Sequence, residues 1–96
     1  MIAPDEMEAL INAQLGYIAA LDPRDPHDRE ARRREVAYLR LLIEQSVQII
    51  RRLAAPLAEA QRLQAELVCV HMLYEMARLE NAAAYLCRTF EATSSK

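Results

Sequence analysis

The sequence predicts an all-α protein of three helices, in which a short acidic helix packs on a long helical hairpin. The chain of 96 residues contains one glycine and four prolines, and it is rich in alanine, leucine, glutamate and arginine, which favour helices. Its apolar residues also recur at intervals of three and four, the spacing that places them on one face of a helix. Because this length makes one domain at most, we expect residues 1–96 to fold as a single unit.

The first helix is expected over about residues 5–21. Asp5 is placed to cap it, with Glu8 three residues later, and Gly16 weakens its middle. Six apolar residues recur along it at helical spacing: Met7, Leu10, Ile11, Leu15, Ile18 and Leu21. Residues 1–22 contain four acids and no base, so the helix is acidic.

The stretch LDPRDPHD ends this pattern, because two prolines within four residues cannot continue a helix. Asp25 and Pro26 then supply the N-cap and the first turn of a second helix, expected over about residues 26–53. Its apolar stripe consists of Val36, Leu39, Ile43, Val47, Ile50 and Leu53, with Tyr38, Leu42 and Ile49 beside it.

Pro56 leaves two alternatives open: it starts a third helix at its first turn, or it kinks one very long helix. A hairpin buries the apolar stripe within the monomer, whereas a continuous rod needs a dimer to cover it. The hairpin is the preferred expectation, with a third helix over about residues 57–91 and a tail at 92–96.

The third helix has two apolar faces. The first contains Val68, Cys69, Met72, Met76, Leu79, Ala83, Leu86, Cys87 and Phe90. The second contains Leu63, Leu67, Val70, Tyr74, Ala77 and Tyr85. Two apolar faces have more surface than the other two helices of one chain cover, so we expect a homodimer through this helix. The pattern does not distinguish the internal face from the interface.

We expect the partner or dimer interface to use apolar residues beside the predicted core stripes. They are Tyr38, Leu42 and Ile49 on the second helix, and Leu63, Leu67, Val70, Tyr74 and Tyr85 on the third. Tyrosines at such positions combine a large apolar contact with a polar end.

The two cysteines lie on one face of the third helix, eighteen residues or about 27 Å apart, too far for a disulfide within that helix. We expect both to be reduced and to pack in the core as small hydrophobic residues. Cys69, Met72 and Met76 share one side and are soft enough to bind Cu(I), but methionine filling a core is the commoner role. No metal or other cofactor is therefore expected.

His71, Glu75 and Arg78 form a polar stripe between the two apolar faces. A histidine and a glutamate one turn apart could transfer protons or supply two ligands to a metal. Zinc needs three or four ligands, however, and the other histidine, His27, lies in the proline-rich break. The preferred interpretation is a solvated stripe with a Glu75–Arg78 ion pair.

The stretch HML around His71, together with ENAAAYLCRTFE, resembles the histidine phosphotransfer domain, a helical bundle that relays phosphate through an exposed histidine. The resemblance covers about twenty residues and implies a phosphorelay carrier that uses His71. In that family a lysine and a small residue follow the histidine, whereas this chain has Tyr74 and Glu75. A carboxylate at that place repels an incoming phosphate.

Charge and motifs exclude several functions. Residues 22–35 contain five acids and five arginines, with Asp28–Arg32 and Glu30–Arg34 at helical spacing, so no basic face for nucleic acid is expected. The longest uncharged run, 9–21, is too short to span a membrane, and no secretory signal is recognised, so a cytoplasmic protein is expected. Chorismate mutases of the AroQ type are helical dimers of similar length, but they need arginines on the first helix. The first helix of this chain has no base, so this enzyme is not expected.

No nucleophile, base and orienting group come together in the pattern, so we expect a protein that is not an enzyme. The expected function is a non-enzymatic module that binds or sequesters a protein partner of unknown identity. Small bacterial proteins of this kind include secretion chaperones, immunity proteins and inhibitors. The alternative is the phosphorelay carrier through His71.

Overall fold

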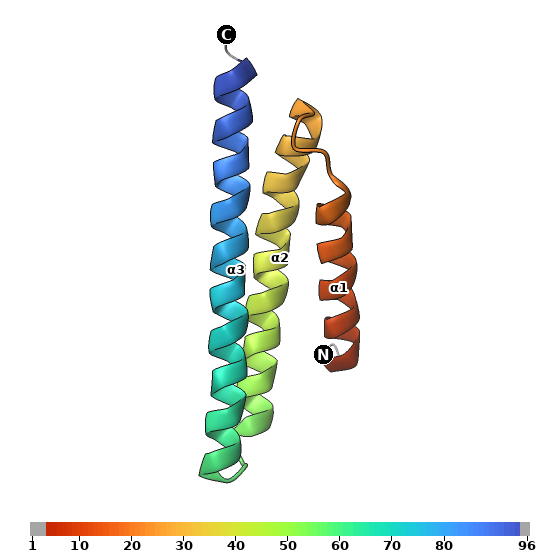
Figure 1. Cartoon of the computed structure of the whole chain (residues 1–96). Coiled ribbons are helices and arrows are strands. Elements are labelled where there is room, and N and C mark those ends of the chain that lie inside the picture. The colour runs from red at the N-terminus through yellow and green to blue at the C-terminus, as the bar shows by residue number, and fades with distance from the viewer. Residues whose placement is uncertain (1–3, 95–96) are drawn as a thin grey trace.

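The computed structural model describes residues 4–94, which form three helices: α1 (Pro4–Ala20), α2 (Pro26–Ala54) and α3 (Glu59–Ser94). Figure 1 shows α2 in the middle, with α1 and α3 on either side of it and antiparallel to it. There is no strand among residues 4–94, so the all-α, three-helix prediction is confirmed. The predicted bounds differ from the observed ones by at most three residues at each end.

The break between α1 and α2 follows the predicted chemistry. The carboxylate of Asp25 accepts a hydrogen bond of 2.9 Å from the backbone N–H of His27, and Pro26 is the first residue of α2. The cap predicted for the first helix is wrong, because α1 begins at Pro4 and Asp5 therefore lies inside its first turn. Proline suits a first helical position, since it has no N–H to leave unpaired there.

The chain forms the expected hairpin at Pro56, but α3 begins only at Glu59, so Pro56 lies in the turn and not in the first turn of the third helix. α2 ends at Ala54, and the N–H of Leu57 donates to the carbonyl of Ala54 at 2.9 Å. Pro56 has no N–H to continue the helical bonding, so the chain reverses and α3 returns along α2. The hairpin covers one side of α2 along most of its length.

The core lies along α2 and includes side chains from all three helices. Its buried members are Ile18, Val36, Leu39, Ile43, Val47, Cys69, Met76 and Ala83. The internal face of α3 is therefore the face that contains Cys69 and Met76. Both cysteines are free and buried, as expected: the Cys69 thiol lies 3.8 Å from the carbonyl of Val47, and the Cys87 thiol 3.9 Å from that of Arg29.

The three helices do not close into a compact triangle. Within residues 4–94, no Cα atom of α1 comes within 8 Å of one in α3, whereas both helices pack directly on α2. The Cα atoms extend over 58 × 21 × 14 Å. α1 is also shorter than the hairpin and leaves the end near Pro56 uncovered (Figure 1).

Candidate interaction surfaces

The outer face of α3 carries the larger set of exposed apolar side chains. We call Leu63, Leu67, Val70, Tyr74 and Tyr85 the outer seam; each of them is between 53% and 69% exposed. The first four alternate at spacings of four and three residues, and Ala77 and Asn81 continue the series. This is the heptad spacing of helices that pair side by side. The second apolar face predicted for this helix is thus the one that the monomer leaves uncovered.

The interface residues predicted on α2 have three different environments. Tyr38 is exposed, Ile49 is half-buried and Leu42 is only 5% exposed. The prediction for Leu42 is wrong, because a side chain buried within the chain cannot anchor another protein. α2 packs against helices on two sides, so its buried arc is wider than the single stripe that the sequence pattern indicated.

A groove lies between α1 and α3, with α2 as its floor. It consists of two adjoining cavities that share Ile11 of α1 and Met72 of α3. The first, of about 240 Å³, is lined by Ile11, Leu15, Leu39, Ile43, His71, Met72, Glu75, Met76 and Leu79. The second, of about 420 Å³, is lined by Met7, Glu8, Ile11, Ser46, Ile49, Ile50, Val68 and Met72. The groove was not foreseen from the sequence, because its width depends on how far α1 and α3 stand apart.

The polar stripe borders this groove. His71 and Glu75 both line the smaller cavity and are exposed, and Arg78 pairs with Glu75 at 3.4 Å. The predicted Glu75–Arg78 ion pair is thereby confirmed. Because Glu75 lies one turn from His71 on the same wall, the imidazole has a carboxylate as a close neighbour.

Three arginines of α2 pair with three glutamates of α3 along one edge of the hairpin. Arg40 Nε donates to Glu80 at 2.7 Å, and the remaining pairs, also at 2.7 Å, are Arg33–Glu91 and Arg51–Glu66. The guanidinium groups of Arg40 and Arg51 lower the pKa of Glu80 and of Glu66, respectively. The pairs join residues far apart in sequence, so helical spacing within one segment could not indicate them.

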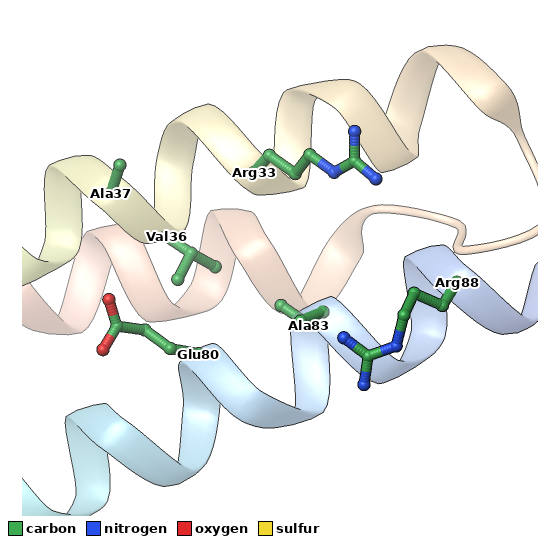
Figure 2. A pocket seen from close by; sticks show the side chains of 7 residues that line it. Arg33, Val36, Ala37, Glu80, Ala83 and Arg88 are labelled. Atoms are coloured by element: carbon green, nitrogen blue, oxygen red, sulfur yellow. The ribbon is translucent and has the colours of Figure 1, made fainter. Parts of the chain in front are cut away.

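A shallow hollow of about 290 Å³ adjoins this edge between α2 and α3. Figure 2 shows Arg33 and Val36 of α2 facing Glu80, Ala83 and Arg88 of α3 across it. Glu80 and Arg33 already belong to the interhelical ion pairs, so charges of both signs surround the hollow. This balance gives no preference for either an anion or a cation.

The start of α2 differs from the two ion pairs that the sequence predicted there. Glu30 pairs with Arg33 at 3.6 Å, while Asp28 accepts a hydrogen bond of 2.8 Å from the backbone of Asp22. Arg32 donates to the carbonyl of Leu21 at 3.2 Å. Asp28 and Arg32 thus bind the connection from α1 rather than each other, because the connection folds back over the first turns of α2.

Arg29 is a structural residue that sequence reasoning missed. Its side chain is buried, donates to the carbonyls of Pro23 and Arg24 at 3.1 and 3.3 Å, and lies 6.0 Å from the ring centroid of Phe90. It therefore ties the α1–α2 connection to the far end of α3. The sequence shows it only as one of five arginines that balance five acids in residues 22–35.

Within the described part of the chain, no group of three or more histidine, cysteine, aspartate or glutamate side chains is placed to hold a metal ion. No helix among residues 4–94 combines the length and hydrophobicity that crossing a membrane requires. Comparison with protein-family models, with curated proteins and with solved structures finds no significant match to this chain.

Proposed function

We propose that this chain is a non-enzymatic protein–protein interaction module that forms a homodimer through the outer seam and binds or sequesters a second protein. Secretion chaperones, immunity proteins and inhibitors act in this way. The observation that carries the proposal is the outer seam itself, an apolar row that lies away from the core and whose first four residues have heptad spacing.

The area of the outer seam suits a stable pair. Its five side chains expose roughly 600 Å² in one chain, so a symmetric pair of seams buries at most about 1,200 Å² from them, the lower end of the range for specific interfaces. Leu67 and Tyr74 lie in the middle of the seam, where neighbouring contacts exclude water most completely. A symmetric pairing needs no second surface, because each copy presents the same face.

Sedimentation equilibrium tests the homodimer with a double variant, Leu67→Lys with Tyr74→Lys. Two lysines on each copy place like charges in the outer seam, so we expect the dissociation constant of the dimer to rise at least about 100-fold. Leu41→Lys is the matched control, since Leu41 is equally apolar and exposed but lies on α2, and it should leave association unchanged. A monomeric wild-type protein at about 100 μM, or a double variant that still dimerises, would contradict the proposed pairing.

The phosphorelay alternative rests on the exposure of His71. Glu75 on the same groove wall argues against it, because a carboxylate repels a phosphoryl donor. Incubation with receiver domains charged by acetyl phosphate tests this alternative directly. Phosphate transfer to the wild-type protein that disappears in His71→Gln would support the alternative. No phosphate transfer to the wild-type protein would refute it.

A further inference from the structure

The groove is an unpartnered apolar surface distinct from the outer seam. Met72 and Val68 line its α3 wall, whereas Leu67 and Tyr74 of the outer seam point from the outer face of the same helix. On a helical wheel Met72 and Tyr74 are separated by about 160°, nearly opposite sides of the helix. A dimer through the outer seam therefore leaves the groove open in both copies.

We propose that the groove binds an amphipathic helix of the partner protein, with apolar residues toward α2 and basic residues on its flanks. The inference rests on the proposed interaction function and names the chemistry of its partner. The bound helix would lie between α1 and α3 as the fourth helix of a bundle, a common mode of peptide recognition.

The length of the groove fits a short helix. Its α3 wall runs from Val68 to Leu79, which corresponds to about 16 Å or about three helical turns. The two cavities, of about 240 and 420 Å³, follow one another along this wall and meet at Met72. Apolar residues one to two turns apart on a partner helix would reach both cavities.

The charges around the groove select the flanks of that helix. Glu8 lines the α1 wall, Asp5 lies one turn before it on the same side, and Glu75 lines the α3 wall. α1 carries no basic residue. Glu75 and Arg78 pair with each other, so the excess negative charge at the rim comes from Glu8 and Asp5 on α1. Lysine or arginine flanks therefore complement the rim, whereas a fatty acid would bring its carboxylate against acids.

A second copy of this chain is a poorer occupant than a basic partner. Its α1 is acidic, with Asp5, Glu6 and Glu8. The α1 of a second copy would therefore bring carboxylates toward Glu8. The outer seam of a second copy is already covered in the proposed homodimer.

Fluorescence anisotropy with two labelled peptides of about 18 residues tests the proposal. Both peptides carry the same leucine stripe at helical spacing, and they differ only in having lysines or glutamates on the flanks. We expect the lysine peptide to bind in a saturable manner and at least about tenfold more tightly than the glutamate peptide. In Glu8→Gln with Glu75→Gln, which alters exposed side chains alone, this preference should fall to less than about threefold.

Met72→Arg places a cation at the junction of the two cavities and should abolish binding of the lysine peptide, with the helical circular dichroism of the variant confirming that it folds. The Leu67→Lys, Tyr74→Lys variant is the matched control on the outer seam and should bind the peptide as the wild type does. A homodimer that binds neither peptide overturns the groove proposal and leaves the seam pairing intact. A monomer that binds the lysine peptide overturns the pairing alone.

Equal binding of both peptides, or binding lost in the outer-seam variant and retained in Met72→Arg, also overturns the groove proposal. Saturable binding of octyl glucoside below its micellar concentration, without binding of either peptide, would assign the groove to a small apolar molecule instead. That outcome counts against a helical partner.

Discussion

Two leucines on the same turn of α2 offer a direct test of the packing. Leu39 is 2% exposed in the centre of the core, whereas Leu41 is 56% exposed on the solvent side. Leu39→Ala leaves a cavity beside Ile43 and Met76. These two side chains also line the groove, so moving them into the cavity would enlarge the groove instead of restoring the packing. We expect the free energy of unfolding to fall by about 3 kcal/mol, within the range of about 2–5 kcal/mol for replacing a buried leucine by alanine.

That loss is large for a chain of this length, whose total stability is expected to be about 5–14 kcal/mol. Leu41→Ala, in contrast, should change stability by less than about 0.5 kcal/mol, since it removes an exposed side chain and alanine favours a helix. Urea unfolding followed by circular dichroism measures both variants, with the protein concentration matched because dimerisation would add to stability. Equal losses in the two variants would refute the assignment of the buried side of α2.

Two further predictions concern titratable side chains. Cys69 and Cys87 are buried, and burial raises the pKa of the Cys69 thiol. Ellman's reagent should therefore label both cysteines only after the protein is unfolded in urea. Rapid labelling of the native protein would contradict the packing of α3. Arg40 lowers the pKa of Glu80, so the stability from this pair is present above the unfolded pKa of about 4.3 and is lost as the pH falls through the lower folded pKa. Urea unfolding between about pH 3 and 7 should therefore show Glu80→Gln less stable than the wild type at neutral pH, with the difference shrinking on acidification; a constant difference would exclude a charge contribution.

Local chemistry made much of the helix pattern predictable from the sequence. The proline-rich break and the Asp25 cap act over a few residues, so LDPRDPHD indicated both where one helix stops and where the next begins. Pro56 was ambiguous, because the same residue can start or kink a helix. A hairpin covers the apolar stripe of α2, which favours it over a continuous rod, and the structure has that hairpin.

The interaction surfaces depend on packing between helices and were predictable only in part. Periodicity found both apolar faces of α3, but the choice of Cys69 and Met76 for the core depends on which face meets α2. Leu42 was misplaced because α2 has neighbours on two sides, which a single stripe does not reveal. Arg29 was overlooked, since the carbonyls it binds come from the fold of the preceding connection.

The attachment of α1 to α2 has a thermodynamic consequence for binding in the groove. Since the backbone of α1 packs on α2 and not on α3, α1 is the element that can separate while the α2–α3 hairpin remains paired. Each separation removes one wall of the groove, so the apparent affinity for a ligand there is the intrinsic affinity multiplied by the fraction of molecules with α1 in place. A mutation in the contact between Ile18 and α2 would thus weaken binding without touching the ligand, and a bound ligand would slow hydrogen exchange throughout α1.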